Sequence, residues 1–219
     1  MTLKTLPETT TAQIDALCAL APVIPVLTFN SAAEALPIAE ALVEGGLPVL
    51  EVTLRTEAAL EAIQLLADKL PEARIGAGTI ANPAQYQAAC EAGASFIVTP
   101  GSTRELLETG IESPIPLLPG IQTISEMMEG LQRGYRRFKF FPASVAGGPA
   151  ALKAYGGPFP DVRFCPTGGI RLETASDYLS LGNVMCVGGS WLTPAELIAQ
   201  QNWAGIRDIA RETVQRLQD

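Results

Sequence analysis

The chain has 219 residues, of which 47% are hydrophobic and 17% are charged. This composition excludes a disordered chain and is typical of one folded domain, which we expect to span residues 1–219. The 15 Lys and Arg residues are outnumbered by 23 Asp and Glu residues, and the net charge of −8 argues against nucleic acid and anionic membranes as partners.

The sequence contains no histidine. This excludes Ser-His-Asp and Cys-His nucleophile systems and histidine-ligated catalytic zinc sites. Acid–base or covalent chemistry must therefore come from carboxylates, Lys, Tyr, Cys or hydroxyl groups. The four cysteines form no C-x-x-C pair and lie in apolar surroundings, so we expect reduced core thiols and no metal site. They are Cys18, Cys90, Cys165 and Cys186.

The amino-terminal segment gives no targeting signal. Residues 1–13 are polar and rich in threonine, without the basic start and apolar stretch of a signal peptide. The chain also lacks the run of about 18 apolar residues that a membrane span needs. A cytoplasmic location is the expectation.

Short apolar runs alternate with longer segments of helical character. The expected strands are Val23–Phe29, Val49–Leu54, Arg74–Gly78, Phe96–Thr99, Ile115–Leu118, Arg137–Phe141, Arg163–Cys165 and Val184–Val187. The expected helices are Ser31–Val43, Glu57–Leu70, one opening at Asn82-Pro83, Ser102–Leu107, Thr123–Leu131, Pro149–Tyr155, Glu173–Leu181, Pro194–Ala199 and Trp203–Leu217.

Eight strand–helix units in one domain favour a (β/α)8 barrel, an α/β TIM-barrel fold. A further helix near Thr11–Leu20 would precede the first strand, within a helical segment at residues 1–20. The competing architecture is a doubly wound open sheet, which usually has a glycine-rich turn after its first strand. Here that strand ends in Thr28-Phe29-Asn30, without glycine.

The second expected strand carries a polar face. Leu50, Val52 and Leu54 alternate with the polar side chains of residues 51, 53 and 55, and the apolar set suits the covering helices. Glu51 would then point into the barrel, with Arg55 at the rim. One reading is a buried Glu51–Arg55 ion pair that only holds loops in place. The position at the functional end of a strand favours a role in chemistry.

Of the four lysines, only Lys139 lies between aromatic residues in the middle of an expected strand. Burial and a neighbouring cation such as Arg55 would favour its neutral amine. A neutral amine can attack a carbonyl to form a Schiff base, and Glu51 would be its proton shuttle. The alternative is a lysine that extends to the barrel mouth and only pairs with Glu51.

Glycines cluster at the ends of the last two strands, in Gly168-Gly169 and Gly188-Gly189. Their backbone N–H groups can approach an anion closely, and Thr167 and Ser190 add hydroxyl donors. Two such pairs on adjacent strands predict a phosphate site. Small residues at the ends of strands three to five leave space for a ligand or form tight turns. These lie in Gly76-Ala77-Gly78-Thr79, Thr99-Pro100-Gly101 and Pro119-Gly120.

Seven segments occur in a recognisable order: LEVTLRT (50–56), GAGT (76–79), TPG (99–101), PLLPG (116–120), FKFFPA (138–143), CPTGGI (165–170) and GGSW (188–191). Together they resemble the 2-keto-3-deoxy-6-phosphogluconate (KDPG) and 2-keto-4-hydroxyglutarate (KHG) aldolase family. The resemblance runs from about residue 20 to the C-terminus.

The resemblance implies a class I, metal- and cofactor-independent lyase on a (β/α)8 barrel, usually a homotrimer. It would cleave KDPG to pyruvate and D-glyceraldehyde 3-phosphate in the Entner-Doudoroff pathway of carbohydrate metabolism, and KHG to pyruvate and glyoxylate. The same resemblance implies roles for particular residues. These are Lys139 as the Schiff-base lysine, Glu51 as the acid/base, Arg55, Thr79 and Pro100 around the pyruvyl carboxylate, Phe141 as an apolar wall, Thr167 beside the imine, and Gly168, Gly169, Gly189 and Ser190 at the phosphate.

One residue departs from the family pattern, in which a glutamate often follows FPA; here it is Ser144. Two other functions remain open on the same barrel. A phosphosugar isomerase or epimerase would use Glu51 as a base without a covalent lysine, and a non-catalytic barrel would sense a phosphorylated sugar acid. The relative preference for KDPG, its galactonate epimer and KHG also stays open.

Overall fold

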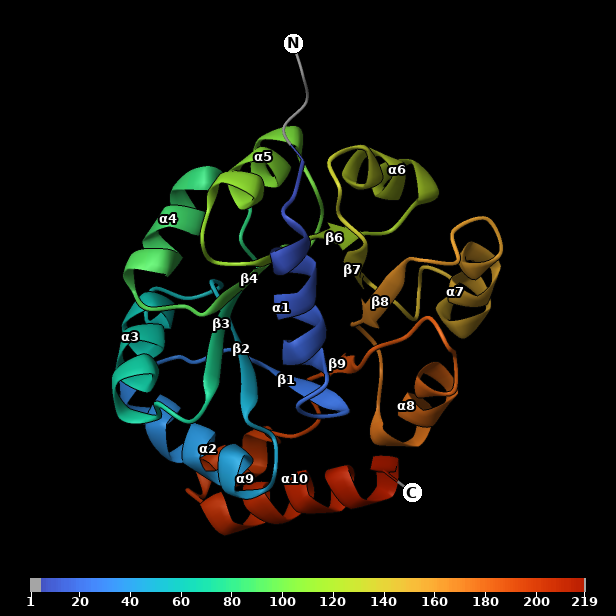
Figure 1. The fold of residues 1–219 in the computed structure, drawn as a ribbon. Coiled ribbons are helices and arrows are strands. Elements are labelled where there is room, and N and C mark those ends of the chain that lie inside the picture. Colours follow the sequence, from blue (N-terminus) through green and yellow to red (C-terminus); the bar gives the residue numbers. More distant parts are fainter. Residues whose placement is uncertain (1–4, 219) are drawn as a thin grey trace.

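Parallel strands form the centre of the molecule and helices surround them, as Figure 1 shows in the computed structural model, which describes residues 5–218. The α/β class expected from the sequence is confirmed. The strands are β1 (Val23–Leu27), β2 (Val49–Thr53), β3 (Arg74–Gly78), β4 (Phe96–Val98), β5 (Leu117–Leu118), β6 (Gly120–Ile121), β7 (Arg137–Phe140), β8 (Arg163–Pro166) and β9 (Val187–Gly189).

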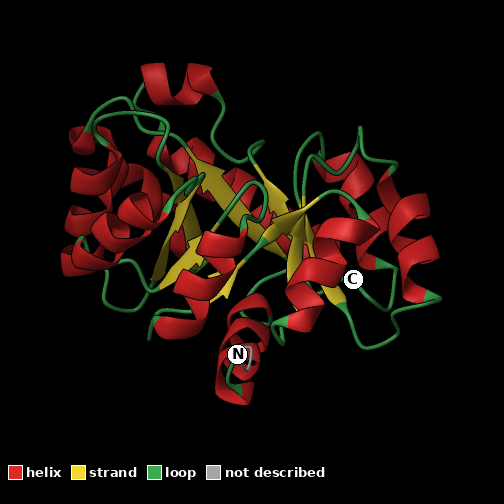
Figure 2. Ribbon diagram, turned by 90° about the horizontal axis from the view of Figure 1, so that it is seen from above, coloured by secondary structure: helices red, strands yellow, loops and turns green. Residues whose placement is uncertain are grey.

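Helices follow most strands along the chain, and Figure 2 shows them on the outside of the sheets. They are α1 (Glu8–Cys18), α2 (Ala32–Glu44), α3 (Ala59–Lys69), α4 (Pro83–Glu91), α5 (Arg104–Glu112), α6 (Ile124–Gln132), α7 (Gly148–Gly156), α8 (Leu172–Leu179), α9 (Ala195–Ala199) and α10 (Trp203–Gln218). The expected start of α4 is confirmed, because the Asn82 side chain accepts a hydrogen bond from the backbone N–H of Gln85 and Pro83 occupies the first turn. Among the residues described, no helix combines the length and apolar character needed to cross a membrane.

The strands form two parallel sheets. Six strands pair in the order β5-β4-β3-β2-β1-β9, and three pair in the order β6-β7-β8. Two isolated parallel bridges, Phe164 to Val184 and Thr167 to Gly188, link the region of β8 to that of β9. The sheet surface is therefore strongly curved around a common interior.

The fifth expected strand, Ile115–Leu118, has wrong boundaries. The chain pairs with β4 at Leu117–Leu118, and after Pro119 it pairs with β7 at Gly120–Ile121. Pro119 has no N–H to donate, so the ladder is interrupted there. Its carbonyl instead accepts from the backbone N–H of Lys139. Residues 119–120 thus lie inside a broken strand and do not end it.

The eighth strand was also misplaced. It was expected at Val184–Val187, but the regular strand is Val187–Gly189, and Val184 makes only an isolated bridge. The apolar run marked the buried segment correctly. The pairing with β1 continues through Gly188 and Gly189. Glycines are tolerated at these positions because the pairing is made by backbone groups and not by side chains.

Two apolar clusters fill the fold. The larger lies between strands and outer helices, and the smaller fills the interior at the end where the strands begin. There α1 contributes Ile14, Leu17 and Cys18, which pack against strand-starting residues such as Val49 and Phe96. Figure 1 shows α1 lying across this end of the strands. The opposite ends of the strands are left for the site described below.

A glycine in α5 tests the packing of this core. A Cβ at Gly110 would lie 2.4 Å from Tyr135 Oη and 2.7 Å from Leu117 Cδ2. We expect Gly110→Ala to lower the free energy of unfolding by about 1–3 kcal/mol through overpacking, despite alanine's better helix propensity. Urea unfolding measures the change. Gly182→Ala, where a Cβ meets nothing within 4 Å, is the matched control and should change stability little. A stabilised Gly110→Ala variant would contradict this packing.

Candidate active site

Lys139 lies in the middle of β7, with its backbone paired to β6 and β8. The neighbouring residues on the strand, Phe138 and Phe140, are fully buried in the cluster under the helices. Alternation along the strand then directs the Lys139 side chain to the interior. The predicted position of this lysine, in a strand and between buried aromatic rings, is confirmed.

The Lys139 ammonium group forms a buried ion pair with the Glu51 carboxylate. Nζ lies 2.9 Å from Oε1 and 3.3 Å from Oε2, and the two side chains are only 6% and 4% exposed. Glu51 lies on β2, a strand of the other sheet. The predicted inward direction of Glu51 is therefore confirmed.

Arg55 does not take part in this pair. Its side chain is exposed, and in the described part of the chain it forms no hydrogen bond or ion pair. The buried Glu51–Arg55 ion pair considered from the sequence is therefore wrong, because Glu51 pairs with Lys139 and the Arg55 side chain is exposed. The alternative for Lys139, a side chain that extends to the barrel mouth and pairs with Glu51, is correct in its partner but wrong in its exposure, since Lys139 is buried.

Two neighbours shape the space around the pair. A Cβ at Gly78 would lie 2.2 Å from Glu51 Oε1, so the glycine makes room for the carboxylate. The Phe141 ring also borders the pair, with its centroid 5.4 Å from Lys139 Nζ. Such a ring face attracts a cation and excludes water from one side of the amine. The role of Gly78 was missed from the sequence, where it was counted only among small residues that leave space.

A pair of threonine hydroxyls continues the polar face of β2 toward the ends of the strands. Thr53 Oγ1 donates to the carbonyl of Leu27 at 2.9 Å and lies 2.7 Å from Thr28 Oγ1. Because a hydroxyl has one proton to give, Thr28 must be the donor in the second bond. Thr28 was not selected from the sequence. It is two residues after Val26, so alternation places it on the same face of the strand, and Val26 pairs with Glu51 in the structure.

The glycine-rich ends of β8 and β9 lie side by side, as predicted. Thr167 and Gly188 form a parallel bridge, and a Cβ at Gly188 would lie 2.2 Å from Thr167 Oγ1. That hydroxyl is buried and has no hydrogen-bond partner among the described residues. Gly168 and Gly169 follow with φ of 101° and 72°, a left-handed conformation that favours glycine. The turn therefore leaves backbone groups and one unused hydroxyl at the strand ends.

Two further segments border this turn. Ser144 follows the strand of Lys139, donates its backbone N–H to the carbonyl of Gly168, and places its Oγ where a Cβ of Gly169 would be. Gly168 also lies close to the Phe141 ring, which a Cβ there would meet at 3.2 Å. The glycine turn is thus physically continuous with the Lys139 surroundings. Gly189 is buried in β9 under the Trp191 ring, and Ser190 is exposed just after it.

The remaining predicted residues lie at the ends of β3 and β4, on the same edge. Thr79 follows β3 with a φ of 62°, rare for a threonine, and strained backbone of this kind concentrates at functional sites. Pro100 follows β4 and is half-buried. The preceding Thr99 is buried, and its Oγ1 accepts from the backbone N–H of Gly120. This bond holds the ends of the fourth and fifth strands together.

The cysteines are free, and none is suited to be a nucleophile. Cys165 and Cys186 are buried with their Sγ atoms 3.6 Å apart. Hydrogen bonds with Cys165 and Cys18, together with burial, hold the pKa of Cys186 well above its ordinary value. The expectation of core thiols is confirmed for these three, but Cys90 is only half-buried. Among the described residues, no cluster of three or more His, Cys, Asp or Glu side chains could hold a metal ion.

Comparison with known proteins agrees with this site. The family model of KDPG and KHG aldolase matches residues 14–209. A 2-dehydro-3-deoxy-phosphogluconate aldolase of Pseudomonas aeruginosa is 53% identical over 209 residues, which cover 95% of each chain. A KHG/KDPG aldolase of Escherichia coli K12 is 51% identical over 194 residues, 89% of this chain and 91% of the relative.

A solved structure is similar in the same way. The KDPG aldolase of Legionella pneumophila, with pyruvate captured as a covalent carbinolamine intermediate, superposes with a TM-score of 0.89. It is 51% identical and covers 91% of this chain and 97% of its own. Fold and site thus define an α/β protein of the lyase class. The chain belongs to the KDPG and KHG aldolase family, and the resemblance stated from its motifs is confirmed.

Proposed function

We propose that this protein is a class I aldolase that cleaves KDPG to pyruvate and D-glyceraldehyde 3-phosphate. The observation that carries the proposal is the buried contact between Lys139 Nζ and Glu51 Oε1, which joins the middle of β7 to the middle of β2 in a chain of this family. The KHG/KDPG name of the Escherichia coli relative supports cleavage of KHG to pyruvate and glyoxylate as a second activity.

The same proposal includes the complete form of the fold. The two sheets, with strand five divided between β5 and β6, form a closed (β/α)8 barrel with α1 as an added helix. The bridges between the β8 and β9 regions support closure on one side, and the Thr99–Gly120 hydrogen bond supports it on the other. Active sites of such barrels lie at the carboxyl ends of the strands.

In the proposed mechanism, the nucleophile is formed from the Lys139–Glu51 ion pair. Transfer of one proton from Nζ to the Glu51 carboxylate turns the buried ion pair into a neutral amine and a carboxylic acid. The Lys139 amine then attacks the C2 carbonyl of the keto acid. Glu51 returns its proton as the carbinolamine loses water to give a protonated imine.

Cleavage uses the imine as an electron acceptor. Glu51, or a water that it holds, takes the proton of the C4 hydroxyl, and the C3–C4 bond breaks as its electrons form the enamine. Glyceraldehyde 3-phosphate leaves as the C4 alkoxide becomes its aldehyde. The enamine carbon then takes a proton, and water hydrolyses the imine to release pyruvate and free Lys139. The aldolase differs here from the isomerase and sensor alternatives, because only the aldolase needs a neutral lysine in the barrel.

We propose substrate contacts for the residues around the pair. Arg55, Thr79 and Pro100 surround the pyruvyl carboxylate, Phe141 forms the apolar wall, and Thr167 lies beside the imine. The phosphate is held by the glycine turns and a hydroxyl, with Gly168, Gly169, Gly189 and Ser190 as its contacts. The left-handed glycines and the unused Thr167 hydroxyl support this placement.

We also propose a homotrimer, as the resemblance implies. Large exposed apolar side chains are available for such a contact, namely Ile124 and Met128 on α6 and Val145 between β7 and α7.

Trapping with borohydride tests the covalent step. After incubation with pyruvate and borohydride, peptide mass spectrometry should find a reduced pyruvyl adduct on Lys139 and none on Lys153, which is exposed on α7. Lys139→Arg should lose the adduct and lower kcat by roughly 10⁴-fold or more. Lys153→Arg is the matched control and should keep both. A folded wild-type protein that gives no adduct would exclude the imine mechanism.

Replacing the proton shuttle should separate chemistry from binding. Glu51→Gln keeps an oxygen near Lys139 but removes the base, so we expect kcat to fall by about 10²–10⁴-fold with little change in KM. Steady-state kinetics with coupled detection of pyruvate measures both. A rise in KM at constant kcat would make Glu51 a binding residue only.

The space beside Glu51 can be probed by one methyl group. A Cβ at Gly78 forces the carboxylate to move, and a displacement of about 1 Å in a catalytic group can cost 10²-fold in rate. We expect Gly78→Ala to lower kcat by about that factor while its far-ultraviolet circular dichroism stays that of the wild type. Gly182→Ala should keep full activity, since its Cβ meets nothing. Unchanged kcat in Gly78→Ala would show that the carboxylate position is not critical.

A further inference from the structure

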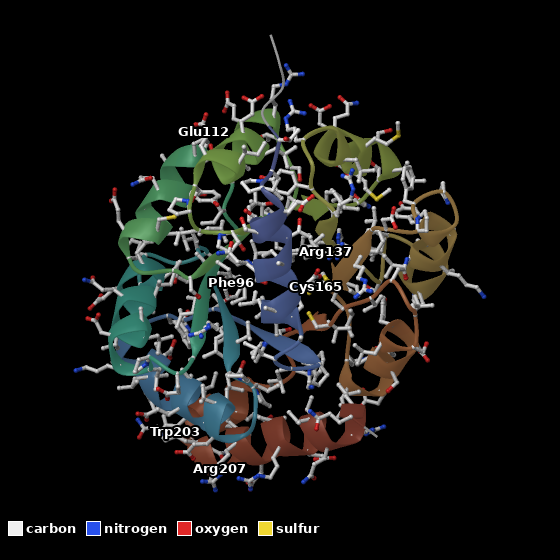
Figure 3. All side chains as sticks on the ribbon, viewed as in Figure 1. Phe96, Glu112, Arg137, Cys165, Trp203 and Arg207 are labelled. Carbon is white, nitrogen blue, oxygen red and sulfur yellow. The ribbon has the colours of Figure 1, made fainter. Side chains whose placement is uncertain are left out.

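A hollow lined by three arginines lies at the end of the molecule where the strands begin. Its volume is about 380 Å³, and its lining residues are Thr11, Arg136, Arg137, Pro160, Asp161 and Arg163. Figure 3 shows Arg137 beside α1, the helix that crosses this end. Neither Lys139 nor Glu51 lines it, so the hollow is separate from that buried pair.

The register of the strands places two of these arginines opposite each other. Arg137 starts β7, Arg163 starts β8, and the two are direct partners in the parallel ladder. Their side chains therefore leave the same face of the sheet at neighbouring positions. Like charges in this arrangement repel unless an anion lies between or beside them.

Intramolecular contacts neutralise only part of this positive charge. Arg137 makes a bidentate ion pair with Asp15 of α1, with its Nη2 2.7 Å from Oδ2. Arg136 uses Nη1 to bond the carbonyls of Leu131 and Tyr135, which do not neutralise it.

Arg163 is exposed; its backbone N–H donates to the carbonyl of Arg136, but its guanidinium group makes no hydrogen bond or ion pair among residues 5–218. Asp161, also at the hollow, is the one acidic residue in the lining, and its carbonyl accepts from Arg137 Nη1. Arg136 and Arg163, which are not paired with a carboxylate, carry two positive charges against the one negative charge of Asp161. The lining is therefore locally positive, although the chain has a net charge of −8.

We propose that this hollow binds the phosphate group of a small metabolite, outside the site of aldol cleavage. Arg163 and Arg136 supply planar guanidinium donors, which match phosphate oxygens by paired hydrogen bonds. Thr11 adds a hydroxyl, and Arg137, held rigid by Asp15, fixes the wall of the site. The proposal is independent of the phosphate contacts assigned above to the substrate. Thr167 immediately precedes Gly168, one of those substrate contacts. It is four residues after Arg163, which is about 13 Å along the strand direction at 3.3 Å per residue.

Equilibrium dialysis with radiolabelled inorganic phosphate, at constant ionic strength set by chloride, tests the site. We expect two phosphates per wild-type chain, one in the hollow and one at the proposed substrate phosphate position. Arg163→Gln should weaken one of them by about tenfold or more, the loss expected for a charge-assisted hydrogen bond. Ser190→Glu should weaken only the other, because it places a negative charge beside the glycine turns. Arg211→Gln, an exposed arginine on α10, is the matched control and should bind like the wild type.

Aldolase activity equal to that of the wild type confirms that Arg163→Gln is folded. If Arg163→Gln binds phosphate as the wild type does, the hollow is not a phosphate site. If the wild type binds only one phosphate, and this binding is lost in Ser190→Glu but kept in Arg163→Gln, the proposal of a phosphate site in the hollow is also overturned. A single site lost only in Arg163→Gln supports the hollow and contradicts the substrate phosphate position, so the two proposals fail separately.

Discussion

The rest of the site depends on one contact, the buried ion pair between Lys139 and Glu51. Each charge alone would be costly in an interior with little water, and each is tolerated because the other is within hydrogen-bond distance. Removal of one partner from a buried pair typically costs about 3–5 kcal/mol, since the other charge is left uncompensated. The fold must therefore hold both side chains at once, and the neighbouring glycine and aromatic ring serve that requirement.

The pair also requires the curvature of the sheets. β2 lies between β1 and β3, whereas β7 lies between β6 and β8, so the two strands share no ladder. In a flat sheet, side chains on strands this far apart would not meet. The contact of 2.9 Å between Lys139 and Glu51 shows that the inner faces of the two sheets face each other across a narrow interior. α1 and its apolar residues close one end of that interior, which leaves the chemistry to the other.

Much of this arrangement could be predicted from alternation along single strands. Alternation placed Glu51 and Lys139 inside, because each stands between apolar residues that suit the helix side. Alternation does not choose between Arg55 and Lys139, the two partners considered for Glu51, since the choice depends on which strands face each other over 88 residues of chain. The end of β5 before Pro119 was expected, but the resumption of pairing at Gly120–Ile121 was missed, because a proline followed by a glycine indicates a turn when the sequence is considered alone. The shift of β9 was missed because glycines read as turns from sequence alone.

The absence of histidine explains why one pair has to do so much. In many enzymes an imidazole moves protons while another group attacks; in the mechanism proposed above, the Glu51 carboxylate takes that part for Lys139. The proposed nucleophile and its base are then the same two groups that stabilise each other in the buried ion pair. Under that proposal one contact serves both the stability of the interior and the reaction, so a substitution in either residue should affect both.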